Sequence, residues 1–263
     1  MLNIFFNESF LNGFLGALIA GLFTGVGGFA IYLKKKYSQT NINVMLNIAA
    51  GVMLSASFFA LLVPSMEELI EINEDVHEAG FCYCGAVTIG VALVWILNIL
   101  LPHEHNNMVR HGPKFDLKKA WLFIIAISLH KLPEGLAVGV AYSAENFINP
   151  LSLVVGIALH NIPEGLTMAI SLVAAGESKL KSALIALSIG MIQPLGAVLG
   201  LLLIGASTSI IPIAMAMAGG TLLFVVINEI LPETYGYKNT EKSAVAVFAG
   251  FIVMSYLFMA LGE

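Results

Sequence analysis

Residues 150–174 read PLSLVVGIALHNIPEGLTMAISLVA, an apolar run whose middle carries His160 and Glu164. About 20 apolar residues in a helix cross the hydrocarbon core of a bilayer, so this run predicts a transmembrane helix. A related phrase, HKLPEG at residues 130–135, lies within the apolar run 119–142. Ionisable side chains at membrane depth are costly and usually mark a site or a pathway. The two runs therefore predict a membrane protein with a polar site shared by two neighbouring helices.

The composition supports the same class of protein. The chain is 58% hydrophobic and 11% charged, whereas about a quarter of the residues in a soluble domain are charged. It has no basic patch interleaved with aromatic residues, which argues against nucleic-acid binding, and no nucleotide-binding motif. We expect an all-α polytopic protein with eight transmembrane helices, at residues 10–33, 44–66, 80–101, 119–142, 150–174, 182–204, 209–231 and 243–262.

The charged residues predict the orientation of these helices. Every Lys and Arg except Lys131 falls in an odd-numbered connection, and connections rich in Lys and Arg face the cytoplasm. Both termini are therefore expected outside. The second connection, residues 67–78, is acidic and carries no Lys or Arg. It either attracts cations to an outer mouth or is an ordinary solvated loop.

Small and sulfur-containing residues indicate packing rather than chemistry. Glycines four residues apart allow the backbones of two membrane helices to approach closely. Methionines such as Met215 and Met217 are expected to fill gaps in the core. Cys82 and Cys84 are too close in sequence to form a disulfide with each other, and the first residues lack the features of a removable signal peptide. The glycine pairs in question are Gly21/Gly25, Gly135/Gly139 and Gly196/Gly200.

Four side chains form the candidate metal site. His130 and Glu134 are one helical turn apart, and His160 and Glu164 repeat the spacing, so each pair shares a helix face. Two imidazoles and two carboxylates suit zinc and also accept iron, manganese or cobalt. A single His–Glu pair could be an interior ion pair, but a duplicated pair favours a metal.

Proline and glycine accompany both pairs. Pro133 and Pro163 lack an N–H, so each leaves one carbonyl of the preceding turn without its helical partner. At membrane depth such a carbonyl is tolerated only where it faces protein or a water-filled cavity. Kinked or broken helices that carry ligands are common in transporters. Gly135 and Gly165 then leave space for a neighbouring backbone.

With these motifs, the chain resembles the ZIP (Zrt/Irt-like protein) family of divalent-metal transporters, and within it the short bacterial branch. The phrases at 130–135 and 160–165 match the family's paired motifs in helices four and five. Three further stretches resemble its helices two, six and seven, namely Ala50–Ser55 through Pro64, Gln193–Gly196 and Asn228–Glu233.

The resemblance implies most of the remaining architecture. It implies one transmembrane domain over residues 1–263, built as an inverted 3+2+3 repeat in the cytoplasmic membrane. Spans 1, 4, 5 and 6 would move as a transport unit against a scaffold of spans 2, 3, 7 and 8. A homodimer is typical of the family.

The chain departs from the family at a second metal subsite. Family members often use an Asn after the helix-four His and a Glu before the helix-six Pro, but this chain has Lys131 and Gln193 there; Asn161 is retained in helix five. We expect Lys131 to take the space and charge of a second cation, leaving a single-metal site. The alternative is that Lys131 pairs with Glu134 in a purely structural role.

Further residues are candidate metal contacts along the pathway. Glu229 lies near the expected cytoplasmic end of span seven. His103, His105 and His111 lie in the expected third cytoplasmic connection, where the resemblance implies a loop that receives released metal. The same three histidines are also compatible with a solvated loop.

The sequence therefore predicts uptake of divalent metal by alternating access, with zinc favoured and cadmium among the other candidates. The metal is the substrate, and no cofactor or nucleotide is expected. An intramembrane zinc-dependent hydrolase is the first alternative, but there is no HExxH motif and both glutamates are committed as ligands. The second alternative is a metal sensor that does not transport, because Lys131 and Gln193 alter the site.

Overall fold

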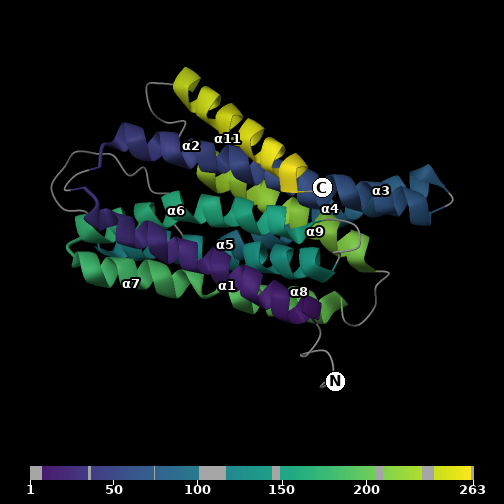
Figure 1. Ribbon diagram of the computed structural model, residues 1–263, viewed down its shortest axis with the longest axis horizontal. Helices are drawn as coiled ribbons and strands as arrows, with labels where there is room; N and C mark the ends of the chain where they lie inside the picture. Colours follow the sequence, from purple (N-terminus) through teal and green to yellow (C-terminus); the bar gives the residue numbers. More distant parts are fainter. Residues whose placement is uncertain are drawn as a thin grey trace.

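The computed structural model describes residues 8–34, 37–73, 75–100, 117–143, 149–204, 210–232 and 240–261, and within these ranges every regular element is helical (Figure 1). Seven of the described helical segments are long and apolar enough to cross a membrane. The segment α5 supplies the eighth expected helix. The α-helices are α1 (Glu8–Phe29), α2 (Gln39–Ser57), α3 (Val63–Ile72), α4 (Val76–Leu100), α5 (Leu117–Ser143), α6 (Pro150–Ala174), α7 (Lys179–Gly190), α8 (Gln193–Ile204), α9 (Ile211–Val225) and α11 (Thr240–Leu261).

Two of the expected spans contain a π-helical turn. Phe58–Leu62 joins α2 to α3, so the second span is one rod that extends past the expected end at residue 66. Val226–Ile230 continues α9 in the same way. A proline follows closely in both cases, Pro64 and Pro232. π-turns inside helices are frequent at functional sites, and here the second and seventh spans each have one shortly before a proline.

The sixth expected span, 182–204, is not one continuous helix. It is divided into α7 and α8 by a turn at Met191 and Ile192, where the amide of Ile192 bonds to Ile189 O at 3.0 Å in a tight three-residue step. Pro194 explains the position of the break, because it has no N–H to donate to the carbonyl four residues earlier, that of Gly190 at the end of α7. In contrast, α5 and α6 continue past Pro133 and Pro163. The broken helix expected at the ligand motifs therefore occurs one span later.

Four helix pairs form the main packing contacts. On one side of the molecule α1 packs against α6, and α5 against α8; on the other, α2 packs against α11, and α4 against α9 (Figure 1). Two of the predicted glycine pairs, Gly135/Gly139 and Gly196/Gly200, lie at the contact of α5 with α8, whereas Gly21/Gly25 faces α7. A Cβ at Gly135 would be 2.0 Å from Gln193 O, and one at Gly139 would be 2.2 Å from Ala197 O. These are backbone-to-backbone contacts, which only glycine permits.

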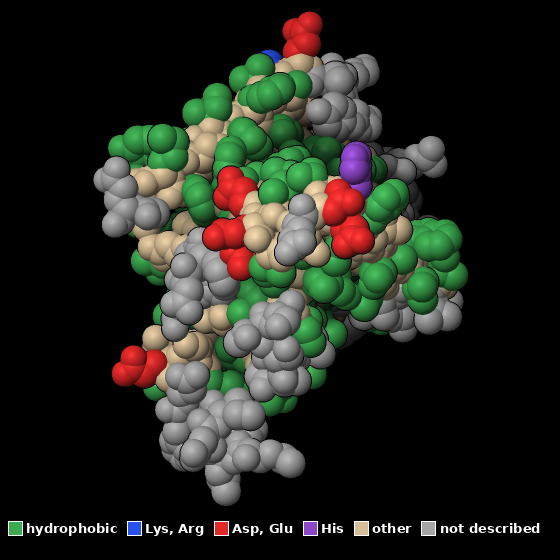
Figure 2. Space-filling model, turned by 90° about the vertical axis from the view of Figure 1, so that its right-hand side faces the viewer, with side chains coloured by type: hydrophobic (Ala, Val, Ile, Leu, Met, Phe, Trp, Pro, Cys, Tyr) green, Lys and Arg blue, Asp and Glu red, His purple; other side chains and the backbone are tan. Residues whose placement is uncertain are grey.

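The two ends of the helical bundle carry opposite charge. Exposed acidic side chains gather where α3 is followed by α4, among them Glu67, Glu71 and Glu78 (Figure 2). At the opposite end, before α2 or at the starts of α7 and α11, lie Lys34, Lys179, Lys181 and Lys242 (Figure 1). Between the ends the surface is rich in exposed apolar side chains, including most of α11. This arrangement is that of a multi-pass membrane protein.

The sulfur-containing residues fit the expected packing roles in part. Cys82 and Cys84 are free thiols. Met215 is buried in the main apolar cluster, and its helix α9 packs against α5 and α2 as well as α4. The burial of Met215 agrees with a packing role, whereas Cys82 is only partly buried and Cys84 is exposed.

Candidate metal centre

The candidate site lies where four helices meet in the middle of the molecule. Glu134 comes from α5, while His160 and Glu164 come from α6, which packs against α5. The side chain of Gln193 reaches in from the first residue of α8. The backbone of α1 closes the site through the carbonyl of Ala20. The apolar sequence thus assembles a polar cluster from the expected first, fourth, fifth and sixth spans.

Three of the predicted ligands converge. One ligand atom from each of Glu134, His160 and Glu164 lies within 4.8 Å of the other two, and all three residues are buried. His160 Nε2 is 3.9 Å from Glu134 Oε1 and 3.7 Å from Glu164 Oε2. Zinc ligands lie at about 2.0–2.2 Å from the ion, which sets tetrahedral ligand atoms roughly 3.3–3.6 Å apart. A small contraction would therefore bring these groups onto a metal.

Lys131 lies between the two carboxylates. It is fully buried, and its Nζ donates to Glu134 Oε2 at 2.9 Å, to Asn161 Oδ1 at 2.6 Å and to Glu164 Oε2. The contact with Glu134 alone would match a simple structural pair. The contacts with Asn161 and Glu164 do not match such a pair, because they join the ammonium of Lys131 in α5 to two residues of α6.

Gln193 completes the polar network. Its Nε2 donates to Glu134 Oε2 at 2.6 Å, and its Oε1 accepts from Asn161 Nδ2 at 3.0 Å. Asn161 Nδ2 also donates to Ala20 O at 2.7 Å, which ties α6 to α1. Because Gln193 begins α8, the positive end of that helix dipole also faces the carboxylate. Lys131, Asn161 and Gln193 thus belong to one connected hydrogen-bond network with Glu134.

The two oxygens of Glu134 have different surroundings. Oε2 accepts from both Lys131 and Gln193, whereas Oε1 has no hydrogen-bond partner among the described residues. A buried carboxylate oxygen normally has a partner, and this one is directed toward the His160 side of the cluster. Glu134 Oε1 is therefore the oxygen that could bind a metal cation without first giving up a hydrogen bond to a described residue.

The formal charge of the network is uneven. Two carboxylates and one ammonium give −1 when His160 is neutral, and a divalent metal would change this to +1. Neither state is neutral, and charges interact strongly in a poorly solvated interior. Glu164 keeps a residual exposure of 8%, whereas Lys131 and Glu134 have none. Among the described residues of the cluster, Glu164 is therefore the most exposed.

Some predicted residues lie outside the described part. His130 is in α5 and Glu229 is in the π-turn after α9, but the structure does not describe their side chains. His103, His105 and His111 fall outside the described residues altogether. The roles of His130 as a ligand, of Glu229 as a pathway contact and of the three histidines as loop contacts therefore stay predictions.

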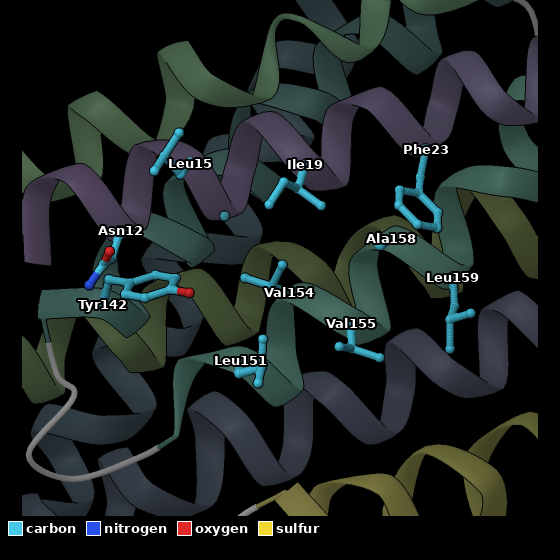
Figure 3. A pocket seen from close by; sticks show the side chains of 11 residues that line it. Asn12, Leu15, Ile19, Phe23, Tyr142, Leu151, Val154, Val155, Ala158 and Leu159 are labelled. Atoms are coloured by element: carbon cyan, nitrogen blue, oxygen red, sulfur yellow. The ribbon is translucent and has the colours of Figure 1, made fainter.

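An apolar groove lies beside the site but is not part of it. It has a volume of about 520 Å³ and runs between α1 and α6, from Asn12 and Tyr142 at one end to Phe23 and Leu159 at the other (Figure 3). Most of its lining is hydrocarbon, which offers no ligands to a metal ion. The groove faces the lipid-exposed flank of the bundle and does not provide an ion path.

Sequence reasoning did not identify the contribution of α1. Ala20 acts through its backbone carbonyl, and Gly21 approaches Gly190 so closely that a Cβ there would be 2.2 Å from Gly190 O. A backbone acceptor leaves no signature in residue type. The Gly21/Gly25 spacing was the only available signal, and it indicated close packing without indicating the partner.

An all-helical membrane protein with a buried His–carboxylate cluster between its helices belongs to the class of proteins that bind or move cations within a bilayer. Comparison with known proteins narrows this class. The profile of the family described as ZIP Zinc transporter matches residues 100–258. The chain is 32% identical over 253 residues to the zinc transporter GufA of Myxococcus xanthus, covering 95% of this chain and 99% of the relative.

Two further relatives extend the similarity. The zinc transporter ZIPB of Bordetella bronchiseptica is 33% identical, covering 94% of this chain and 81% of the relative. The human zinc transporter ZIP11 is 28% identical, covering 97% of this chain and 99% of the relative. The chain therefore belongs to the ZIP zinc transporter family, which is a family of transporters and not of enzymes.

Proposed function

We propose that this chain carries Zn²⁺, or another divalent transition metal, across the cytoplasmic membrane into the cell. The observation that carries the proposal is the convergence of Glu134, His160 and Glu164, three buried ligand residues from two helices. His130 would be a fourth ligand, because it precedes Glu134 by one turn. Two carboxylates offset the charge of one divalent cation, which lowers the cost of holding it away from water.

Transport would proceed by alternating access. Clustered ligands between helices of a polytopic membrane protein provide a binding position that can be opened to either side in turn. Neither a hydrolase nor a nucleotide-driven pump is favoured, since both glutamates point into the cluster and the sequence has no nucleotide-binding motif. The flux would follow the gradient of the metal.

The test replaces one ligand and one matched glutamate elsewhere. Glu164→Gln should abolish zinc accumulation in cells that lack their own zinc uptake, because it removes a charged ligand with little change in shape. Glu177→Gln makes the same chemical change at a surface glutamate paired with Lys181 at 2.8 Å, and it should leave uptake intact. Normal uptake by Glu164→Gln at equal membrane abundance would refute the proposal.

We also propose the inverted repeat and the outward-facing termini. In a 3+2+3 inverted repeat, the contact of α1 with α6 corresponds to the contact of α8 with α5, and that of α2 with α11 to that of α9 with α4; these four pairs are the main packing contacts. The acidic and basic ends of the bundle support the orientation. In a cysteine-free background, a cysteine introduced at Asp75 should react with a membrane-impermeant maleimide added to intact cells. A cysteine introduced at Lys181 should react only after the cells are permeabilised. The reverse pattern would invert the topology.

A division into two units and a homodimer complete the proposed architecture. The helices of spans 1, 4, 5 and 6 would form the moving unit, and those of spans 2, 3, 7 and 8 the scaffold. The broad exposed apolar surface of α11 offers the scaffold a face for lipid or for a second copy. Cross-linking in native membranes distinguishes a dimer from a monomer.

Lys131 leads us to propose a single bound metal. Its ammonium already fills the gap between Glu134 Oε2 and Glu164 Oε2, so a second divalent ion there would meet a fixed positive charge. Anomalous scattering from zinc-loaded crystals should show one ion at full occupancy. Two adjacent ions at full occupancy would exclude this role for Lys131.

Three parts of the proposed pathway lie away from the central cluster. The acidic end of the bundle would attract cations, Glu229 would contact them near the exit, and His103, His105 and His111 would receive them in the third connection. Zinc flux into vesicles measures each contribution after substitution. The same assay separates a transporter from a metal sensor, since a sensor with this site would bind zinc without moving it.

A further inference from the structure

The hydrogen bonds of Lys131 are complete without any metal. An ammonium has three N–H donors, and the three acceptors around Nζ are Glu134 Oε2, Asn161 Oδ1 and Glu164 Oε2. The side chain is fully buried, so these protein groups replace its hydration shell. Lys131 thus places a cation that is covalently attached to the chain among the metal-binding carboxylates.

The attached cation and the proposed ligands share one oxygen atom. Glu164 Oε2 accepts from Lys131 Nζ and lies 3.7 Å from His160 Nε2. Glu134 instead separates the two functions, because Oε2 contacts Lys131 while Oε1 is directed toward His160 and has no hydrogen-bond partner among the described residues. A metal can therefore begin to bind at Glu134 Oε1 and His160 before it competes with the ammonium for Glu164.

We propose that Lys131 is a tethered counter-cation, which offsets one of the two negative charges of the metal-binding carboxylates when no metal is bound and so permits the empty transporter to reorient. This rests on the proposed function, because it concerns the return step of an alternating-access cycle. With Lys131 present the empty network carries −1; without it, two buried carboxylates would carry −2. Since charge in a low-dielectric interior is costly, an empty transporter without Lys131 should switch slowly from access on one side of the membrane to access on the other.

Loss of the Lys131 charge should affect zinc–zinc exchange and net zinc uptake differently. Exchange of internal for external zinc uses only the loaded transporter. Net uptake also needs the empty transporter to return. Removing the tethered charge lowers the charge of the loaded site from +1 to 0 and raises the magnitude of the empty charge from 1 to 2. Net uptake should therefore fall while exchange persists.

The experiment compares both fluxes in the same proteoliposomes containing the purified full-length protein. Lys131→Asn introduces the residue that family members often carry at this position, and Lys131→Met keeps the length of the side chain without its charge. In both variants the ratio of net zinc uptake to zinc–zinc exchange should fall by at least about tenfold, because breaking a buried ion pair is strongly destabilising. Lys181→Asn removes a lysine from the exposed pair with Glu177 and should leave the ratio unchanged.

Persisting exchange shows that a variant is folded and binds zinc, so the ratio isolates the return step. An unchanged ratio, or a proportional fall in both fluxes, would overturn the role of Lys131. The wild-type protein provides a measurement that needs no variant, because it should take up zinc into zinc-free vesicles at a rate comparable with exchange. A wild type that requires internal zinc would also overturn the inference. A wild type that moves no zinc in either mode would instead refute the proposed function.

Discussion

Replacing Gly135 with alanine should disable the site from a distance. The new Cβ would lie 2.0 Å from the carbonyl oxygen of Gln193, 2.8 Å from its carbonyl carbon and 3.0 Å from its Cα. All three atoms belong to the backbone, so no rotation of a side chain relieves the contact. Since 3.4 Å is the lower limit of ordinary van der Waals contact at such a position, α5 and α8 must separate by roughly 1 Å or more.

That separation is large compared with the tolerance of the network. Gln193 Nε2 donates to Glu134 Oε2 at 2.6 Å, and a hydrogen bond between these atoms is lost beyond about 3.5 Å. We expect overpacking to cost about 1–3 kcal/mol, partly offset by the gain of about 1 kcal/mol when alanine replaces glycine in a helix. Zinc uptake should fall by about 100-fold, the scale reported for displacements of about 1 Å at sites that require exact geometry.

Gly85→Ala is the matched control. Gly85 lies in α4, and an added Cβ there meets nothing within 4 Å, so this variant should gain helix stability and retain transport. The assay measures zinc uptake into proteoliposomes together with the Tm of the purified protein. If Gly135→Ala matched Gly85→Ala in both quantities, the close backbone approach of α5 and α8 would not control the site.

Other predictions concern the subsite and the packing around it. The double variant Lys131→Asn, Gln193→Glu should bind two zinc ions per chain instead of one, measured by elemental analysis after equilibrium dialysis, because it adds a carboxylate and removes the competing ammonium. Gln193→Ala should lower the Tm, because it leaves Asn161 with an unpaired buried donor at a cost of about 1–3 kcal/mol; an unchanged Tm would show that the bond of 3.0 Å contributes little. Ser65→Ala removes a buried hydrogen bond of 2.6 Å to Pro212 O and should destabilise the protein by about 1 kcal/mol without changing zinc affinity, as checked by thermal unfolding and zinc titration.

The helices and the ligand cluster were predictable because strong local signals encode both. An apolar run such as residues 150–174 has no stable alternative to a membrane helix. Within it, His160 and Glu164 must share a face. The same reasoning applied to α5 and placed Glu134 correctly. In each case the prediction depended on spacing along one helix and not on contacts between helices.

The bonding of Lys131 was only partly predictable. Its spacing to Glu134 favours a pair within one helix, and that pair is present at 2.9 Å. Its bonds to Asn161 and Glu164 depend on the relative depth of α5 and α6, which no local pattern fixes. The turn at Met191 and Ile192 did leave a signal, since Pro194 lies two residues after it, but a run of apolar residues on both sides concealed it.

The glycine contacts support the proposed division into two units. Within the group of α1, α5, α6, α7 and α8, glycines meet backbone atoms of a partner helix, as Gly135 meets Gln193 O and Gly165 meets Thr24 O at 2.0 Å from an added Cβ. Gly51 does the same between α2 and α11, where an added Cβ would be 1.9 Å from Val247 O. Among the described glycines, none makes such a backbone contact between the two groups.

Where the groups meet, the closest glycine contact involves side chains. A Cβ added at Gly156 of α6 would lie 3.1 Å from Met254 Cε and 3.3 Å from Ala56 Cβ, and methionine is an adaptable apolar side chain. Interlocked backbones resist sliding, because any shift drives main-chain atoms into one another, whereas flexible side chains can repack. The network around Glu134 lies entirely within the first group, so a sliding motion between the groups would carry Lys131 and the metal ligands together. The tethered charge would then accompany the site on both the loaded and the empty passage, as the return step requires.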